Sequence, residues 1–358
     1  MFLNTELFGH QRGASNKGYK KIKYGTMVLS TQNLHLGNAN VNQRFEHGMV
    51  SPAYKTYDIS GCSIDLIAQW IKSDAAKRFF YNATTVGASV CRRNVEWDTL
   101  YGQSLFLPSL PEQEKIANLL TLLSNRIEEQ RQLIIALKKY KRGLSNSLFD
   151  RLSAESESQL CIFGDMMTIL QNNTFSRDNL SVGGNGVRNI HYGDVLIKYG
   201  AVLDLHSENV PVINAEQDIS KFSALSYLRN GDVVFADTAE DYTVGKSTEI
   251  IGAENIAALS GLHTIPCRPQ GSFAPMYLGY YFNSDYFKKQ LYPMVQGTKV
   301  SSISKSEIIK TKIIVPCLQE QARISSIMSA LDDRIDAAKH TTKDLIYLRS
   351  GLLQQLFI

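Results

Sequence analysis

The most regular pattern of apolar and polar positions lies in two long segments, 108–150 and 316–358. In both, apolar residues recur at alternating spacings of four and three residues, with polar residues between them. An average spacing of about 3.5 residues is typical of helices that pack against a partner helix along one narrow stripe. The pattern therefore predicts two long helices that pair with each other. The predicted pairing residues are Leu120, Leu123, Ile127, Leu137, Leu144, Met328, Leu331, Ile335, Leu345 and Leu352.

These two segments are copies of one another. Residues 108–149 align with residues 316–357 at a constant offset of 208 without a gap, and 13 of 42 positions are identical. The stripe is even interrupted at matched positions, by Lys141 and Arg349. A shared amphipathic pattern alone would not match prolines, glutamines and glycines as well, so we infer an internal duplication. Such matches include Pro108/Pro316, Gln113/Gln321 and Gly143/Gly351.

Each long helix follows a stretch in which short apolar runs alternate with turn residues and short helical patterns. The run of 23–30 resembles that of 229–236, so the duplication extends into these stretches. We therefore predict an α+β protein with a pseudo-two-fold internal repeat, in which two mixed α/β domains are separated by two long antiparallel coiled-coil helices. The predicted segments are domain 1 at 1–107, helix 1 at 108–150, a polar linker at 151–159, domain 2 at 160–315 and helix 2 at 316–358.

The first domain is shorter than the second. Only 22 residues precede its matched run at Lys23, whereas about 70 residues of the second domain precede the run at Arg229. The block 163–200 has no counterpart in the first domain. We therefore expect the first domain to lack about 45 residues at its start.

Composition narrows the class of protein. Hydrophobic residues make up 44% and charged residues 20%, which is typical of globular chains. No apolar run approaches the roughly 20 residues of a membrane span, and 1–18 lacks a signal-peptide core, so a cytoplasmic location is expected. The five cysteines form no C-x-x-C pair, which argues against a metal site and a disulfide framework.

The charge distribution is uneven. The net charge is +4, but residues 1–107 carry a net +5 and residues 158–315 a net −2. A basic first third is compatible with a polyanionic partner. The acidic balance of the second domain argues against identifying a nucleic-acid binder from charge alone.

Three phrases point to a known family: 107–113 (LPSLPEQ), 139–144 (KYKRGL) and 189–194 (NIHYGD). Together with the duplication, they resemble the specificity (S) subunit, HsdS, of Type I restriction–modification systems. The resemblance implies two target-recognition domains that each read one half of a bipartite double-stranded DNA target. It also implies that the two helices set the distance between the half-sites and hold two methyltransferase (M) subunits, which restriction (R) subunits join.

The resemblance further implies that this chain is not an enzyme. Methylation, ATP hydrolysis and cleavage would occur in the partner subunits, and S-adenosylmethionine, ATP and Mg are expected only there. The residues agree. Gly245-Lys246-Ser247 looks like the end of a P-loop, but Glu240 replaces its first glycine, and no histidine pair has the H-x-x-x-H spacing of a metal site.

The DNA-binding candidates are residues that suit base edges or phosphates. In the first domain, an ordinary polar loop or a solvated charge pair is an equally good interpretation. The candidates there are Lys20, Lys21, Lys23, Gln32, Asn33, His35, Asn40, Arg92 and Arg93, and in the second domain Lys198, Tyr199, Tyr242, Lys246, Ser247, Lys299 and Ser302.

Two other functions stay open from the sequence. The chain could be an assembly scaffold that forms homodimers, or that no longer reads DNA through its shortened first domain. It could also be an enzyme with an unrecognised site, which the missing motifs disfavour.

Overall fold

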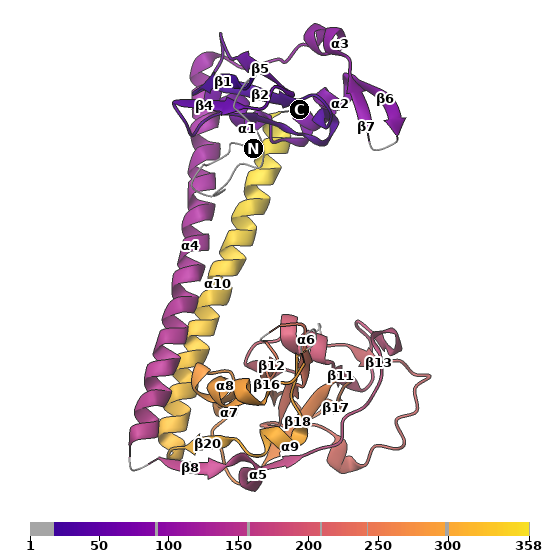
Figure 1. Cartoon of the computed structure of the whole chain (residues 1–358), viewed down its shortest axis with the longest axis vertical. Helices are drawn as coiled ribbons and strands as arrows, with labels where there is room; N and C mark the ends of the chain where they lie inside the picture. The colour runs from indigo at the N-terminus through magenta and orange to yellow at the C-terminus, as the bar shows by residue number, and fades with distance from the viewer. Residues whose placement is uncertain are drawn as a thin grey trace. The chain divides into compact units, whose positions relative to one another are not determined.

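The computed structural model describes residues 18–89, 92–155, 158–207, 210–241, 243–297 and 301–357. The chain divides into two compact units, unit 1 of residues 1–134 and 337–358 and unit 2 of residues 135–336. Two long helices, α4 (Leu110–Ala154) and α10 (Leu318–Leu356), each contribute to both units. Each unit therefore consists of one α/β domain and a stretch of the helix pair (Figure 1). Among the described residues, no helix is both long and apolar enough to cross a membrane.

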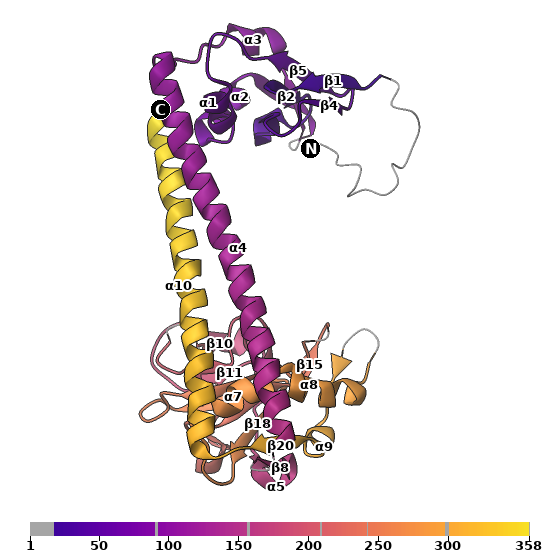
Figure 2. The same ribbon diagram turned by 90° about the vertical axis from the view of Figure 1, so that its left-hand side faces the viewer.

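The two long helices run antiparallel, which confirms the predicted fold class. In unit 2, Lys141 of α4 contacts Asp332 of α10 and Arg151 contacts Glu320, so rising numbers in one helix meet falling numbers in the other. Figures 1 and 2 show the two helices side by side from two directions. Helix α4 continues to Ala154, beyond the helix end at 150 that the sequence indicates.

The apolar stripe faces the partner helix. Leu120, Ile127, Met328, Leu331 and Ile335 are buried, while side chains between the stripe positions, such as Leu122, are exposed. The other five predicted pairing residues are half-buried, namely Leu123, Leu137, Leu144, Leu345 and Leu352.

The domain of unit 1 is built on two small antiparallel sheets. Its core joins side chains of the first two helices, such as Leu66 and Trp70, to Leu120 and Leu353 of the long helices. The sheets are β1 (Lys20–Lys23) with β4 (His47–Val50), and β3 (Ala39–Val41), β2 (Thr26–Ser30) and β5 (Tyr54–Asp58). A hairpin of β6 (Thr84–Ser89) and β7 (Arg92–Val95), the short helix η1 (Leu34–Leu36) and helices α1 (Ile64–Trp70), α2 (Asp74–Asn82) and α3 (Trp97–Gly102) complete it.

The domain of unit 2 is larger. Its main sheet has the order β12-β16-β14-β18-β9, with bounds Val202–Asp204, Ser247–Ile251, Val233–Ala236, Thr264–Pro269 and Met167–Ile169. A second sheet has the order β10-β13-β11-β17, with bounds Leu180–Ser181, Val212–Ile213, Arg188–Ile190 and Ala258–Ser260. Two further pairs are β8 (Gln159–Ile162) with β20 (Lys312–Val315) and β15 (Thr238–Ala239) with β19 (Ser301–Ser302).

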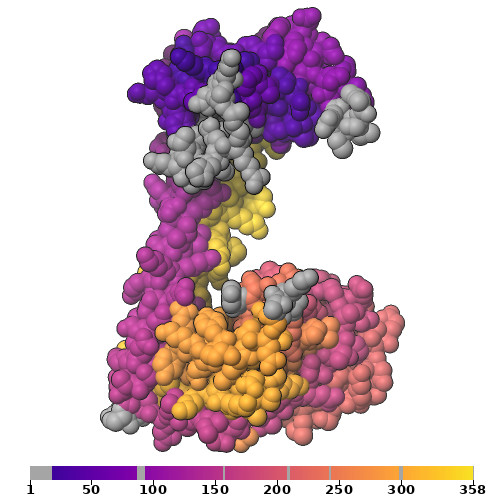
Figure 3. All heavy atoms as spheres, in the orientation of Figure 1, coloured from indigo at the N-terminus to yellow at the C-terminus, as the bar shows by residue number. Residues whose placement is uncertain are grey.

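The helices of this domain are all short. They are α5 (Phe163–Met166), α6 (Tyr192–Ile197), α7 (Tyr277–Phe282), α8 (Asp285–Leu291) and α9 (Lys305–Ile308), with 3-10 turns η2 (Arg177–Asn179), η3 (Ala224–Ser226) and η4 (Tyr292–Met294). Of these, α7 and α8 pack against α4, as Figure 3 shows.

The repeated glutamine makes the same contacts in both units. In unit 1, Gln113 donates to the carbonyl oxygen of Pro108 (2.8 Å) and accepts the backbone N–H of Ser63 (2.8 Å). In unit 2, Gln321 donates to the carbonyl oxygen of Pro316 (2.8 Å) and accepts the N–H of Ala274 (2.9 Å). Because the position needs both a donor and an acceptor, only an amide side chain satisfies it. This contact ties the start of each long helix to its domain.

The basic residue that interrupts the stripe of α10 joins three elements of unit 1. Arg349 donates to the hydroxyl of Ser124 on α4 (Nε–Oγ 2.9 Å) and to the amide oxygen of Gln69 on α1 (Nη2–Oε1 2.6 Å). Polar contacts inside an apolar stripe fix the register of paired helices.

Unit 2 has the matching arrangement. Lys141 of α4 donates to Asp332 of α10 (2.5 Å), at the position that corresponds to Ser124. The hydroxyl of Tyr280 on α7 donates to the other oxygen of Asp332 (3.1 Å), and the Lys141 ammonium lies 4.9 Å from the centre of the Tyr280 ring. Both interruptions of the stripe are therefore joints between the two helices and a domain.

A buried carboxylate holds the start of α7. Glu249 of β16 accepts the backbone N–H groups of Met276 (2.6 Å) and Gly279 (2.8 Å) and is almost fully enclosed. Burial raises the pKa of Glu249 to about 7, against the opposing effect of these backbone N–H groups. Charge at Glu249 is therefore costly in the folded state.

The fully buried Leu120 gives a direct test of the stripe. Leu120→Ala should lower the free energy of unfolding by about 2 to 5 kcal/mol, since it leaves a cavity among packed side chains. Leu122→Ala, on the exposed side of the same helix, is the matched control and should change it by about 0.5 kcal/mol or less. Urea denaturation followed by circular dichroism compares the two. Equal effects would contradict the observed orientation of the helix.

Glu249 predicts a pH dependence of stability. Because its pKa is raised from 4.5 to about 7, the folded state binds the proton more tightly than the unfolded state. The stabilisation is complete below about pH 4.5 and is lost as the pH rises through 7. Between pH 5 and pH 8, the wild type should lose roughly 2 to 3 kcal/mol more than Glu249→Gln. Parallel denaturation curves at both pH values would show no difference if the carboxylate were already charged at pH 5.

Candidate nucleic-acid interface

A buried carboxylate in unit 2 holds two cations at the surface. The side chain of Asp194, in the first turn of α6, is only 1% exposed, and it contacts Arg177 (Nη1–Oδ2 2.7 Å) and Lys198 (Nζ–Oδ1 2.9 Å). The side chains of Arg177 and Lys198 are about half exposed, at 47% and 50%. The turn forms because the Nδ1 atom of His191 accepts the N–H of Gly193 (3.2 Å) and so caps the helix.

The charge states in this cluster follow from its contacts. Burial alone would raise the pKa of Asp194, but the hydrogen bonds from Arg177 and Lys198 outweigh it and hold the pKa below its ordinary value. Burial, and then the nearby charge of Arg177, lowers the pKa of His191. At neutral pH the cluster therefore carries two positive charges and one negative charge. A domain of net negative charge thus has a locally basic surface.

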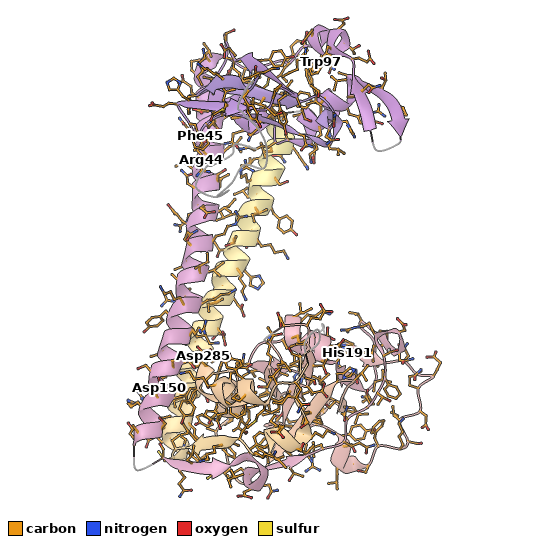
Figure 4. The ribbon with its side chains drawn as sticks, viewed as in Figure 1. Arg44, Phe45, Trp97, Asp150, His191 and Asp285 are labelled. Carbon is orange, nitrogen blue, oxygen red and sulfur yellow. The ribbon has the colours of Figure 1, made fainter. Side chains whose placement is uncertain are left out.

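An aromatic side chain and a hollow lie beside the two cations. The ring of Tyr192 lies between those of His191 (4.7 Å) and His263 (5.3 Å). The neighbouring hollow has a volume of about 470 Å³, and Tyr192, Leu196, Ile197, Thr238, Ala239 and Thr243 line it together with Glu240 and Asp241. Cations suit phosphates, while hydroxyls and apolar atoms suit base edges. His191 lies away from the long helices, whereas Asp285 lies next to them (Figure 4).

Comparison with known proteins identifies the family. Residues 163–346, just over half of the chain, match the family model described as the Type I restriction modification DNA specificity domain. The chain belongs to this family. Its members are the specificity subunits of Type I restriction–modification systems, and their function is recognition of a DNA target sequence.

Three solved structures have a similar fold. The HsdS subunit from Thermoanaerobacter tengcongensis is 20% identical, with a TM-score of 0.52 over 96% of this chain and 83% of that one. A structure described under complex assembly and conformational transition of the type I R-M system is 19% identical, with a TM-score of 0.59 over 96% and 84%. The Type I restriction–modification S subunit from M. genitalium is 16% identical, with a TM-score of 0.53 over 97% and 86%.

Among the second-domain candidates of this specificity subunit, Lys198 belongs to the basic cluster. Ser302 lies in β19, which pairs with β15, and Thr238 of β15 lines the neighbouring hollow. The structure thus brings these two candidates to one region of unit 2. Tyr242 and Lys299 lie outside the described residues.

Three other second-domain candidates have structural roles. Tyr199 and Ser247 are buried, so their side chains are not positioned to contact DNA, which corrects the prediction for both. Lys246 donates from Nζ to the carbonyl oxygen of Leu196 (2.9 Å), and burial, followed by the charge of Lys288, lowers its pKa. Lys246 therefore anchors the end of α6 to β16.

The basic cluster of the first domain is partly engaged. Lys20 donates to the carbonyl oxygen of Tyr54 (2.6 Å), and Lys23 forms an exposed ion pair with Asp58 (3.1 Å). Lys21 is exposed on the same strand, and a hollow of about 470 Å³ separates this strand from β5. Lys21 is the residue of the three that is best placed for a phosphate.

The amide-rich loop of the first domain is largely structural. Asn40 accepts the N–H of Val41 (3.0 Å), and Asn33 precedes η1, whereas Gln32 is exposed. His35 is half-buried, and its Nδ1 atom has no hydrogen-bond partner among the described residues. Gln32 is therefore the most accessible of these candidates.

The arginine pair lies on the β6–β7 hairpin. Arg93 donates twice to Thr84 (Nε–Oγ1 2.8 Å and Nη2–O 2.6 Å) and stacks on Tyr81, with its guanidinium 4.2 Å from the ring centre. Arg93 thus holds the hairpin against α2. Arg92 lies in β7, and its side chain is outside the described residues.

Sequence reasoning missed four residues of the cluster in unit 2: Arg177, His191, Tyr192 and His263. His191 and Tyr192 lie in the NIHYGD phrase that resembles the family, so the sequence contained a signal for them. Arg177 reaches Asp194 across 17 residues, and no spacing rule predicts such a pair.

We predict that the basic cluster contributes phosphate contacts. Arg177→Ala combined with Lys198→Ala should reduce the slope of log K against log salt by up to two contacts, about 0.9 each. Lys310→Ala is the control, because Lys310 is equally exposed but pairs with Glu307 away from α6. Fluorescence anisotropy of labelled duplex DNA at several salt concentrations measures the slopes. A slope that the double substitution leaves unchanged would remove the cluster from the interface.

Proposed function

We propose that this specificity subunit reads a bipartite double-stranded DNA target, one half-site with each domain. M subunits, two in number, and R subunits would assemble on it and perform methylation and cleavage. In this proposal, S-adenosylmethionine, ATP and Mg bind only in the partner subunits.

The duplicated joint carries the proposal. Gln113 and Gln321 tie each domain to a long helix with matching hydrogen bonds, and Arg349 and Lys141 join each domain to both helices at matching positions. Equivalent joints give each domain an equivalent local attachment to the helix pair. Pseudo-symmetric readers suit targets made of two separated half-sites.

Exposed apolar side chains on the helices support the assembly. Leu119, Leu122 and Leu133 of α4 and Tyr347 and Leu348 of α10 are between 44% and 66% exposed within unit 1. A monomer rarely leaves such a series of large apolar side chains uncovered, and protein partners commonly bury them. We assign these faces of the helices to the M subunits.

One observation favours the scaffold as a second candidate. In the first domain, Lys20, Lys23 and Arg93 all contact groups of their own domain. A domain whose cations are engaged in this way has fewer groups for phosphates. In this alternative, only the second domain reads DNA.

Domain exchange tests the proposal. Residues 160–315 are replaced by the matching domain of a related subunit, and the modified adenines of the host genome are mapped. One half of the methylated motif should change, while the number of unread base pairs stays the same because both helices are retained. An unchanged motif would contradict reading by the second domain.

The matching exchange of residues 1–107 separates the two candidates. A change in the other half of the motif supports reading by both domains. An unchanged asymmetric motif supports the scaffold, and a palindromic motif supports a homodimer that presents two second domains.

A further inference from the structure

The domain of unit 1 contains a cavity of about 340 Å³ in its apolar interior. Its walls include Leu29 of β2, Ile67 and Trp70 of α1, Phe80 of α2, Leu100 of α3 and Leu105. Apolar cavities of this size are unusual, because protein interiors are close-packed.

The internal duplication gives each of these side chains a counterpart in unit 2. The run of 23–30 aligns with 229–236, Ser73-Asp74 aligns with Ser284-Asp285, and the residues before α4 align with those before α10. All six counterparts are at most 2% exposed within one core. They are Phe235, Leu278, Tyr281, Leu291, Ile308 and Ile313.

In unit 2 this core is completed by a phenylalanine that enters from β8. The Phe163 side chain is fully buried, with its ring 6.0 Å from that of Phe235. Its backbone N–H donates to Thr311 (2.7 Å), and the N–H of Gly164 donates to Ile309 (3.0 Å). A Cβ atom at Gly164 would lie 3.3 Å from the Ile309 oxygen, so glycine suits this close approach.

The strand before this phenylalanine pairs with the segment before α10. Strand β8 (Gln159–Ile162) runs antiparallel to β20 (Lys312–Val315), as Figure 2 shows. As a result Ile314 is only 1% exposed.

The matching edge in unit 1 is uncovered. Residues 104–107, which correspond to β20, belong to no strand of the described sheets. Phe106, the counterpart of Ile314, is 95% exposed. The Nε2 atom of Gln103 is buried without a hydrogen-bond partner among the described residues. An edge of this kind accepts an added strand.

The chain itself contains a matching strand sequence. Residues 6–9 read ELFG, and residues 161–164 read CIFG, so an apolar residue, a phenylalanine and a glycine recur in the same order. Residues 1–17 lie outside the described residues. We propose that residues 4–7 of the same chain pair with 104–107 and that Phe8 fills the cavity, as β8 and Phe163 do in unit 2.

This assignment changes the interpretation of the shorter first domain. If residues 4–9 correspond to 159–164, the first domain possesses the opening strand of the fold. What it lacks is then an internal stretch between Gly9 and the run at Lys23, the counterpart of much of 165–228. A first domain with a complete core would be a stable attachment for the helices even where its reading surface is reduced.

Protection of Cys62 tests the proposal, because Cys62 lines the cavity. The full chain is prepared with Cys91, Cys161 and Cys317 replaced by Ser, and its alkylation by a maleimide is timed. Phe8→Ala should speed alkylation of Cys62 several-fold and lower the thermal midpoint. Phe2→Ala, the control in the same segment, should do neither. Equal alkylation rates in Phe8→Ala and the parent would overturn the proposal.

A cross-link separates the chain's own segment from that of a second copy. Phe8→Cys in the same background is treated with a short bismaleimide, and the peptides are mapped by mass spectrometry. A link between positions 8 and 62 within one chain supports the proposal. A link only between two chains assigns the cavity to a second copy, and no link to position 62 places Phe8 elsewhere. Either result would overturn the proposal as stated.

Discussion

The requirement that each domain be tied to the start of a long helix through a buried amide organises both units. Gln113 and Gln321 each satisfy a proline carbonyl and a domain N–H, and leaving either group unpaired in the interior would cost about 1 to 3 kcal/mol. A glutamate could accept but not donate, and a leucine could do neither. The repeated proline and glutamine are therefore explained by hydrogen bonding rather than by helix propensity.

The fold was predictable where the information is local. The stripe of Leu120 and Ile127 repeats at helical spacing, and the duplication is visible as matched letters, so the helix pair and the α+β class followed from sequence alone. The interruptions at Lys141 and Arg349 were also visible. Their partners were not, because Asp332 and Ser124 are separated from them by 191 and 225 residues.

The candidate interface was harder to predict, since residue type does not reveal burial. Tyr199 and Ser247 are residue types that suit DNA, but they lie in the core next to Lys198, which does not. The basic surface of a domain with net negative charge depends on Asp194, a buried anion that holds two cations outward. Composition sums such charges and loses their arrangement.

The paired joints also define where the helices tolerate a change of length during evolution. Ser124 and Lys141 lie 17 residues apart on α4, as do Asp332 and Arg349 on α10. An insertion of seven residues between the joints of one helix alone would separate at least one cation from its partner. The same insertion in both helices preserves the apolar stripe and both joints while it lengthens each helix by about 10 Å. Concerted insertions of whole heptads are therefore the length changes that this architecture accepts.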